Sequence, residues 1–584
     1  MSFSGQNRAA SLLSAATIVI VIGAVWLLAP SAGAGKENLF DRLLVGSSPE
    51  VQAHGFGDDG ILRQPNGEVT RPPNVILIVA DDLGYGTLGS YGQRLIETPQ
   101  TDKLARAGMR FSSFYSGAPS CSPSRAALMT GMHTGHTRIR GNQQLEDGGQ
   151  VPLRRGAITL AGFLKGAGYE TAMIGKWGLG DAGSEGDPSL HGFDHVFGYL
   201  NQVLAHNSYP EFLWRNGEKV HLENEVVYLT SPAETQFPGL GSYSTRKSDF
   251  APELLVQEAE SFIGDNTGNP FFLYFPTTAP HPNGEAPEGE KFEVPSAGIY
   301  ESKDWPEAYK RYAALVSHFD ETVGRIVSAV ETAGIAGHTI ILVTSDNGAG
   351  KTAIEQFFGA NGPLRGSKFS LYEGAIRVPL IAYWPDRIAP GTEVSAPVAA
   401  WDLFPTILEA AGVPHRASID GVSFLPTLRG ETQAARRNFL HWEGSGALAA
   451  VAGRWKAILY PGEFSAELYD LIADPSEKEN VASEYPAVLH ALGMAMRESH
   501  REQKGFPILP SEMPSRVSLR KRLKLIFDQG VFFPEVWPPA TESSTRAWRQ
   551  ILIDESIGRM QIERHRGDAK LARIPPEQEG ASIH

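Results

Sequence analysis

The sequence is poor in cysteine: its 584 residues include only one, Cys121. A single cysteine cannot form an internal disulfide, so the cysteine content neither shows nor excludes an oxidising compartment. The chain also lacks an excess of basic residues, because 66 Asp and Glu outnumber 52 Lys and Arg and give a formal net charge of −14. This balance argues against nucleic-acid binding as the main task.

Beyond its N-terminal end the sequence lacks an apolar run of the length that spans a bilayer, about 20 residues. The exception is the run at residues 9–29, which follows Arg8 and precedes Ala32 and Ala34 in an A-x-A arrangement. This order predicts an export signal over residues 1–34, with an uncleaved membrane anchor as the alternative. We therefore expect an exported protein, periplasmic or extracellular, that is either released or held in the membrane by residues 9–29.

Short apolar runs alternate with helical patterns from Asn74 onward. The alternation predicts an α/β fold with a large, mostly parallel sheet flanked by helices over residues 71–415. Short strand-like runs and a helical segment predict a smaller C-terminal α+β domain over residues 416–503. Residues 35–70 are predicted to be a linker, and residues 504–584 a helical extension with a disordered tail. A basic face of that extension could contact anionic lipid, although a solvated face is the more common explanation.

Ionisable and amide side chains follow four of the predicted strands directly. They are Asp81 and Asp82 after "VILIVA", Asp346 and Asn347 after "TIILVTS", Lys176 after "TAMIG", and His281 after "FFLYFPTTAP". Ligands bind at the carboxyl ends of the strands in an open parallel sheet, so we expect these groups to share one edge. Three carboxylates and an amide oxygen suit a hard cation such as Ca²⁺ or Mg²⁺. The alternative for Asp81 and Asp82 is a turn with a helix cap.

The single cysteine lies in the stretch "APSCSPSRAALMTG", residues 118–131. Pro123 is predicted at the first position of a short helix that Gly131 ends, which places Cys121 at the helix N-terminus. Free amides there, together with Arg125, favour an oxyanion site. The same surroundings would favour a thiolate nucleophile, but thiol phosphatases have five residues between Cys and Arg, whereas this chain has three. A buried structural cysteine is the other alternative.

The segment "CSPSR" resembles the C-x-P-x-R signature of the type I sulfatases, members of the alkaline phosphatase superfamily. The resemblance extends from about Pro72 to Ala482. Its other segments, in family order, are "NVILIVADDLGYG", "GKWGLG", "APHP", "SDNG", "LRGSKFSLYEGAIRVP" and "ELYDLIADPSEKENVA". In that family a formylglycine-generating enzyme oxidises the cysteine to formylglycine, an aldehyde. The resemblance implies the same modification of Cys121 and an alkaline phosphatase-like fold.

The resemblance also implies roles for individual residues. One Ca²⁺ would be held by Asp81, Asp82, Asp346 and Asn347 together with the formylglycine derived from Cys121. Arg125 and Lys176 would hold the aldehyde hydrate and the sulfate, while His281 and Lys368 would lie near the ester oxygen. A protonated His281 could then donate a proton to the leaving oxygen.

One position departs from the family pattern. Many members read G-K-W-H-L-G, with the histidine touching the formylglycine, whereas position 178 of this chain is Gly. A candidate substitute is His206 in "QVLAHNSYP", with a surface histidine as the alternative.

These residues imply a sulfuric ester hydrolase, arylsulfatase-like, that cleaves sulfate monoesters of small molecules or carbohydrates. The alternatives are a phosphodiesterase or phosphonate hydrolase of the same superfamily, and a non-catalytic secreted homologue.

Several further residues are interpreted as structural or as open. Glu373 and Arg377 are expected to form a structural ion pair, and His133, His136, His191 and His195 to have structural roles. Aromatic residues of the loops at 181–250 and 283–308 could contact a sugar or aryl ring or could pack in the core; they are Tyr209, Phe212, Trp214 and Trp305.

Overall fold

A computed structural model of the chain describes residues 62–63, 69–145, 149–433, 437–463, 465–509 and 512. All of these belong to one unit, Ala53–His584. The predicted leader at 1–34, most of the predicted linker at 35–70 and most of the extension at 504–584 lie outside the described residues. Within the described ranges, no helix combines the length and apolarity that crossing a bilayer requires.

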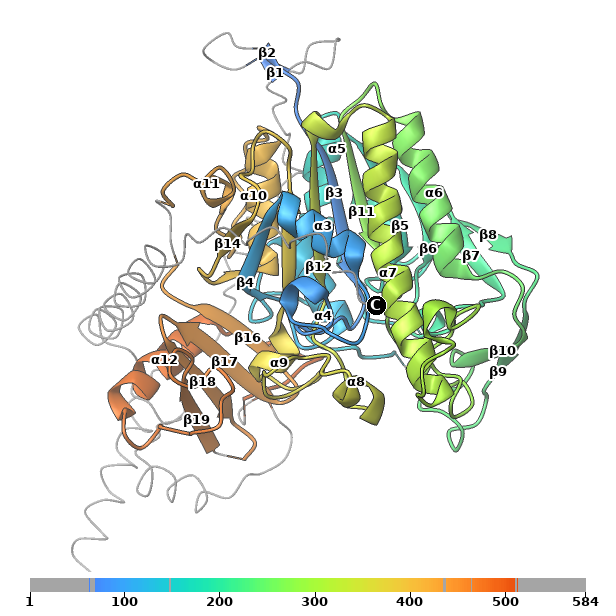
Figure 1. The fold of residues 1–584 in the computed structure, drawn as a ribbon. Helices are drawn as coiled ribbons and strands as arrows, with labels where there is room; N and C mark the ends of the chain where they lie inside the picture. Colours follow the sequence, from blue (N-terminus) through green and yellow to red (C-terminus); the bar gives the residue numbers. More distant parts are fainter. Residues whose placement is uncertain are drawn as a thin grey trace, which may run out of the picture. The chain divides into compact units, whose positions relative to one another are not determined.

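Four adjacent parallel strands form the centre of the main sheet (Figure 1). They are, in spatial order, β12 (Thr339–Ser345), β3 (Asn74–Ala80), β11 (Phe271–Pro276) and β5 (Glu170–Lys176). Every residue of β3, β11 and β12 is buried. Strands covered on both faces require continuous apolar runs, which explains sequences such as "NVILIVA".

Both flanks of the sheet contain antiparallel strands. Beyond β5 come β6 (His195–Tyr199), which is parallel, and the antiparallel β7 (Phe212–Arg215) and β8 (Glu218–His221). Beyond β12 come β13 (Arg377–Tyr383), β4 (Met109–Tyr115), β14 (Thr392–Val394) and β15 (Val398–Ala399). The prediction of a mostly parallel sheet flanked by helices is confirmed at its centre. The strand in "PLIAYW", however, runs antiparallel to β12. No long helix returns the chain between β12 and β13, so β13 starts at the edge where β12 ends.

Helices cover both faces of the sheet. Ile76 and Ile78 of β3 pack in a cluster with side chains of α3 (Pro99–Ala107), α6 (Ala251–Asp265) and α7 (Glu307–Thr332). The alternate residues Val75 and Leu77 pack with α4 (Cys121–Thr130), α5 (Leu160–Gly166), α10 (Leu403–Ala410) and α11 (Leu425–Leu428). Successive side chains of a strand point to opposite faces, so one apolar strand serves both cores.

Shorter elements complete the described part of the chain. These are the paired strands β1 (Leu62–Arg63) and β2 (Val69–Thr70), the paired strands β9 (Glu225–Tyr228) and β10 (Ser242–Arg246), and the helices α8 (Ala353–Phe357) and α9 (Glu373–Ile376). Single 3₁₀ turns lie at Gly89–Tyr91, Pro188–His191, Leu204–His206, Gly298–Tyr300, Ala336–His338 and Ala400–Asp402.

Helix α4 begins earlier than its proline suggested. Cys121 is its first residue and Ser120 its extended N-cap, so Pro123 is the third residue rather than the first. Proline is tolerated throughout the first turn because amides there have no partner within the helix, which makes it a poor marker of the first residue. The helix ends at Gly131, whose φ of +69° is left-handed and whose N–H bonds to the oxygen of Ala127. All ten residues of α4 are buried.

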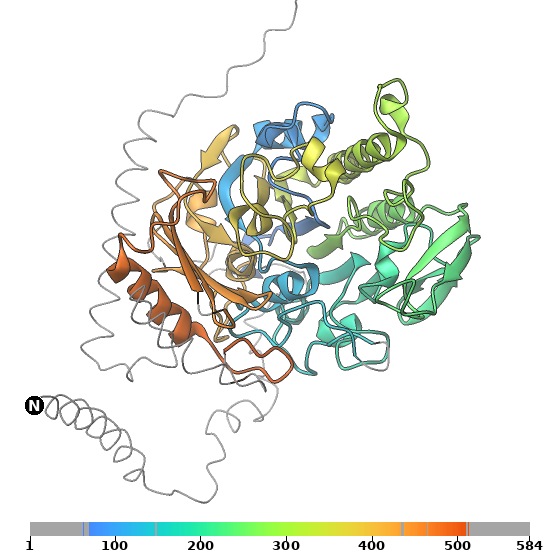
Figure 2. The ribbon, with the colours of Figure 1, turned by 90° about the horizontal axis from the view of Figure 1, so that it is seen from below.

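A second sheet follows the main one. Its four antiparallel strands are β16 (Leu440–Gly444), β17 (Ala447–Ala452), β18 (Trp455–Tyr460) and β19 (Ser465–Asp470). Helix α12 (Pro486–Ser499) lies along one face, against β17 and β18 (Figure 2). Strand β17 was not predicted, because "ALAAVA" contains a single β-branched residue, Val451, and no aromatic residue.

The opposite face of the second sheet packs on the segment that precedes Cys121. The indole Nε1 of Trp442 donates to the backbone oxygen of Ser116 at 2.9 Å. The buried Lys456 of β18 contacts Glu373 at 2.9 Å and Glu477 at 2.8 Å. Tyr115 donates to Glu373 at 3.0 Å. The two sheets are therefore joined by an enclosed charge network.

Replacing Lys456 by Met is expected to destabilise the protein by about 3 kcal/mol, because it leaves two buried carboxylates without their shared cation. The matched control is Lys165→Met, which removes a half-exposed pair with Asp194 and should lower the free energy of unfolding by less than about 1 kcal/mol. Urea unfolding of both variants measures the difference. Equal losses would contradict the role assigned to the network.

Candidate functional site

The polar residues that follow the central strands meet at one edge of the sheet, as predicted. Asp81 and Asp82 follow β3, Asp346 and Asn347 follow β12, and Lys176 is the last residue of β5. The loop after β11 brings His281 to the same place: its Nε2 lies 3.6 Å from Oδ2 of Asp82. Helix α4 adds Cys121 from the other direction.

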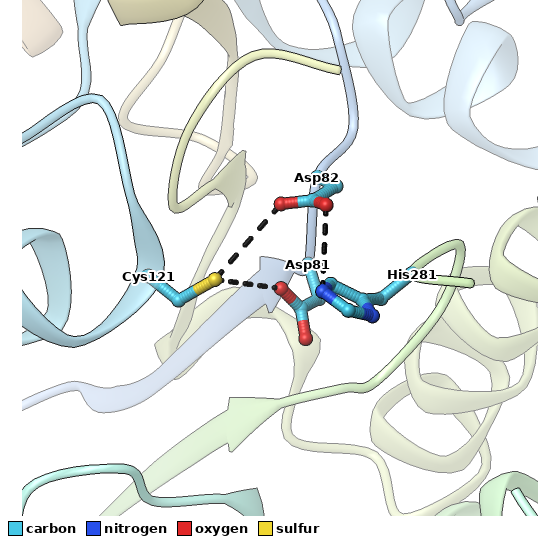
Figure 3. A group of neighbouring side chains, drawn as sticks. All are labelled: Asp81, Asp82, Cys121 and His281. Atoms are coloured by element: carbon cyan, nitrogen blue, oxygen red, sulfur yellow. Dashed lines mark hydrogen bonds and ion pairs between the residues drawn. The ribbon is translucent and has the colours of Figure 1, made fainter. Parts of the chain in front are cut away.

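Figure 3 shows how closely four of these side chains approach one another. The Cys121 thiol donates to Oδ1 of Asp81 at 3.3 Å, and its sulfur lies 3.9 Å from Oδ1 of Asp82. Together with His281, these residues offer ligand atoms that all lie within 4.8 Å of one another. Cys121 and Asp81 have no exposed surface, so the group sits below the molecular surface.

Each carboxylate of the site has its own cation. Lys176 contacts Oδ2 of Asp81 at 2.5 Å, and Lys368 lies 2.8 Å from both oxygens of Asp82. The guanidinium of Arg125 donates to Oδ2 of Asp346 from Nε at 3.0 Å and from Nη2 at 2.7 Å. Its Nη1 also donates to the backbone oxygen of Lys176, which ties α4 to β5.

The pKa values of Asp81 and Asp346 are shifted in opposite directions. Burial favours the neutral form of Asp81, but the cations Lys176, Arg125 and Lys368 outweigh it and hold the pKa well below its usual range. Burial and the charge of Asp81 raise the pKa of Asp346 to about 6, against the opposing effect of Arg125. The side-chain cations therefore do not fully stabilise the charged form of Asp346.

An unpartnered amide oxygen adds to this excess of acceptors. Asn347 donates from Nδ2 to Oδ1 of Asp82 at 2.7 Å, while its buried Oδ1 has no hydrogen-bond partner within the described part of the chain. A buried oxygen without a donor is unfavourable unless another group binds it. Three carboxylates and this amide oxygen are the donor set that hard divalent cations prefer. The residues therefore fit such an ion.

The backbone at Asp82 is strained. Its φ is +64°, a left-handed conformation that costs a non-glycine residue roughly 1 kcal/mol. The conformation is held because the N–H of Asp82 donates to Oδ1 of Asp346 at 3.2 Å and the next N–H donates to Ser345 Oγ at 3.0 Å. The strain turns both consecutive aspartates toward the site.

The thiol of Cys121 is poorly suited to act as a thiolate. Burial and the neighbouring Asp81 raise its pKa to about 12, against the attraction of Lys176 and Lys368. The sequence alone favoured a lowered pKa, because it showed the helix N-terminus and Arg125 but not the adjacent carboxylate. A thiol with this pKa is almost wholly protonated near neutral pH.

His281 differs from the sequence-based expectation of a protonated acid. Its Nδ1 bonds to the backbone oxygen of Pro282 at 2.7 Å, and its Nε2 lies 3.1 Å from Nζ of Lys368. The carbonyl can only accept, so Nδ1 carries the proton and Nε2 accepts from Lys368. Burial and Lys368 lower the pKa of His281 well below its usual range. The proton of this pair therefore resides on Lys368.

Gln202 fills the space beside Gly178, and sequence reasoning missed it. Gly178 has a φ of +73°, and a Cβ placed there would lie 2.8 Å from Oε1 of Gln202. The same oxygen accepts from the Oγ of Ser122, the residue after Cys121, at 3.1 Å. His206, the predicted substitute, instead stacks on His281 with 4.8 Å between ring centroids and bonds to Glu285 at 3.0 Å. His206 thus borders the site through His281, not through position 178.

Other residues interpreted as structural have structural contacts. Arg377 lies 3.4 Å from Glu373, as expected, although Lys456 is the nearer cation. His191 bonds to the oxygen of Glu185 and His195 to Glu258, each at 2.9 Å. Among the loop aromatics, Tyr209 is buried against Phe250 and Trp305 stacks on Tyr300, which favours packing for both; Phe212 and Trp214 contact each other.

A second group, His133, His136 and Asp420, also brings potential ligand atoms together. The N–H of Gly135 donates to Nδ1 of His133 at 3.1 Å, so the ring proton of neutral His133 is on Nε2. That Nε2 faces Asp420 at 3.5 Å, and His136 bonds to the same carboxylate at 2.9 Å. His133 therefore presents no free electron pair to a metal, whereas the buried Nε2 of His136 has no hydrogen-bond partner within the described residues.

The chain was compared with known families and proteins. The model of the sulfatase family matches residues 73–413, more than half of the 584, and a model described as the C-terminal part of N-sulphoglucosamine sulphohydrolase matches residues 367–502. The N-acetylgalactosamine-6-sulfatase of Sus scrofa is 34% identical over 428 residues, which cover 70% of this chain and 76% of that protein. Arylsulfatase A of Homo sapiens is 31% identical over 468 residues, covering 73% and 87%.

Solved structures are similar as well. The crystal structure of Ps i-CgsB in complex with k-i-k-neocarrahexaose superposes with a TM-score of 0.61 at 27% identity. The match covers 76% of this chain and 96% of that one. The range matched by the sulfatase family model, 73–413, contains the strands of the main sheet and the residues of the site.

The raised pKa of Cys121 predicts that an unmodified thiol is almost inert in the folded protein. At pH 8 we expect its reaction with a disulfide reagent to be roughly a thousandfold slower than that of an exposed cysteine, because so little thiolate is present. The control is the double variant Cys121→Ala with Ser261→Cys, which moves the only thiol to an exposed position of α6. Urea should release the reactivity of Cys121, and rapid labelling without urea would contradict the prediction.

Proposed function

The chain belongs to the sulfatase family of sulfuric ester hydrolases, and we propose that it cleaves sulfate monoesters of carbohydrates with a formylglycine made from Cys121 and a bound Ca²⁺. The observation that carries the proposal is the position of Cys121: its sulfur is 3.3 Å from a carboxylate, in a setting that raises the thiol pKa. A thiolate is disfavoured there. An uncharged thiol that is later converted to formylglycine is compatible with this setting.

The proposed aldehyde would lie at the first residue of α4. When hydrated, it supplies one hydroxyl that can attack sulfur and a second that allows sulfate to be released. The N–H groups of Ser122 and Ser124 already donate to Asn142 Oδ1 and to the oxygen of Ser120, so it is the guanidinium of Arg125 that favours an anion here. Arg125 is held by Asp346 and by the backbone of Lys176, so its donors are fixed before any substrate arrives. Such fixed donors stabilise charge that develops in the transition state.

Asp81, Asp82, Asp346 and Asn347 are the residues that would hold Ca²⁺. Two observations support this assignment: the Oδ1 of Asn347 has no hydrogen-bond partner within the described residues, and the pKa of Asp346 is raised. Both indicate that the oxygens of these two side chains lack sufficient positive charge nearby. The ion would supply charge that stabilises the sulfate oxygens and favours an ionised hydroxyl. Lys176 and Lys368, which now contact Asp81 and Asp82, would share this role by contacting the sulfate.

Lys368 and His281 are proposed to handle the proton of the leaving group. Lys368 is the protonated member of the pair, and its Nζ lies 3.1 Å from Nε2 of His281. His281 is held in one tautomer by the Pro282 carbonyl and supported by the stacked ring of His206. Lys368 would donate a proton to the ester oxygen as its bond to sulfur breaks, and Nε2 of His281 would orient the lysine by accepting its hydrogen bond.

The substrate class, partner and location are also proposals. N-acetylgalactosamine-6-sulfatase and the complex with k-i-k-neocarrahexaose support a carbohydrate sulfate. The conversion of Cys121 requires a formylglycine-generating enzyme as a partner. The apolar run at 9–29 supports export to the periplasm or the exterior, either released or anchored. The matched family and relatives do not favour the phosphonate hydrolase alternative or a non-catalytic homologue.

Converting Cys121 should be required for turnover. Protein produced with a formylglycine-generating enzyme should carry an aldehyde at Cys121, detected by peptide mass and by hydrazide labelling. Cys121→Ala should fold but lose at least about 10³-fold in kcat, since no other residue offers the nucleophile. Ser261→Ala, at an exposed position of α6, serves as the control. Full activity with an unmodified thiol, or faster cleavage of a phosphate than of a sulfate ester of the same alcohol, would refute the proposal.

Calcium should stabilise the folded protein through the carboxylate site. At a concentration of 100 times Kd the gain is about 2.7 kcal/mol, so Tm should rise by a few degrees and fall again with EDTA. Asp82→Asn should remove this shift. Asp420→Asn, in the second His and Asp group, should keep it even if its baseline Tm is lower. The opposite pattern would place the cation at the second group.

A further inference from the structure

One exposed aromatic side chain borders the candidate site. Within the described residues, the large hydrophobic side chains that are exposed are Leu95, Leu145, Leu190, Val227, Ile299, Phe357, Phe369 and Tyr485. Of these, Phe369 directly follows a residue of the site, Lys368. Its exposed fraction is 56%. An exposed aromatic ring beside the site is available to contact a bound substrate.

The backbone at Phe369 is held in a conformation that phenylalanine disfavours. Its φ is +72°, in the left-handed region. Two hydrogen bonds fix the segment: the N–H of Phe369 donates to the oxygen of Pro119 at 2.8 Å, and the N–H of Lys368 donates to the oxygen of Ala349 at 2.9 Å. Glycine would adopt this conformation without strain. A strained residue retained at such a position indicates that its side chain is used.

The two anchors also fix where the ring lies. Pro119 is two residues before Cys121, and Lys368 reaches Asp82 from the neighbouring residue. The Nζ of Lys368 is 5.3 Å from the centroid of the Phe369 ring. The exposed ring therefore lies next to the ammonium of Lys368. A molecule whose sulfate contacts Lys368 would extend over this ring.

We propose that Phe369 is a specificity-determining residue on which the C–H face of a sulfated pyranose ring rests while its sulfate ester reaches Cys121. This inference rests on the proposed function and extends it by naming the part of the substrate that is recognised. The apolar face of a pyranose covers an aromatic ring without burying hydroxyl groups. Polar groups that suit the hydroxyl edge of such a ring also lead away from Lys368, since Lys368 contacts His281, His281 stacks on His206, and His206 bonds to Glu285.

The test compares Phe369→Gly and Phe369→Trp with the unaltered, converted protein on a set of pyranose 6-sulfates and on 4-nitrophenyl sulfate. For the best pyranose substrate, Phe369→Gly should raise KM about tenfold and leave kcat within about threefold, while Phe369→Trp should keep most of the affinity. The Tm of Phe369→Gly should stay the same or rise, because glycine relieves the strained φ. Tyr485→Ala, an exposed aromatic at the start of α12, should change neither constant.

The outcomes separate this inference from the proposed function. An unchanged KM in Phe369→Gly, a loss of Tm that accounts for the lower activity, or a larger loss for 4-nitrophenyl sulfate than for the pyranose would overturn the role of Phe369. So would an unaltered protein that cleaves only the aryl ester. A converted protein that cleaves no sulfate ester at all would instead refute the proposed function.

Discussion

The structure depends on neutralising three carboxylates that the strand ends bring together in a dry environment. Asp81, Asp82 and Asp346 cannot remain charged at such close range unless cations accompany them. Lys176, Lys368 and Arg125 each reach one of them from a different element, and the unpartnered oxygen of Asn347 leaves room for a further positive charge. The position of α4 follows from the same requirement, because Arg125 can reach Asp346 only if Cys121 lies beside Asp81.

Much of this arrangement could be predicted from the sequence, because it follows from rules that act locally. Apolar runs marked the central strands, and the carboxyl ends of parallel strands share an edge, so Asp81, Asp346, Lys176 and His281 could be placed together without coordinates. The direction of β13 could not, since it depends on the absence of a returning helix. The raised pKa of Cys121 could not be predicted for a related reason: it follows from burial and from the charge of Asp81, which is 40 residues away in sequence.

The features that were missed share one property: they depend on where a segment distant in the chain comes to lie. Gln202 could be linked to Gly178 only once β6 and the turn after it were placed beside β5. The left-handed backbone of Phe369 has no sequence signal, since the position would suit glycine and carries phenylalanine instead. The first residue of α4 was misplaced because proline tolerates several positions in a first turn. Local patterns therefore identified which residues meet at the edge of the sheet, but not which residues hold or surround them.

Helix α4 is enclosed on two sides, and this has a consequence for how the chain can vary. Ala126 and Met129 face the main sheet, while Ala127 packs with Trp401 and Trp442 against the second sheet. A truncation before β16, or an exchange of the C-terminal portion with that of a distant homologue, would uncover the helix that carries Cys121. The residues from β16 onward therefore support α4, and recombination between homologues should keep these residues together with α4.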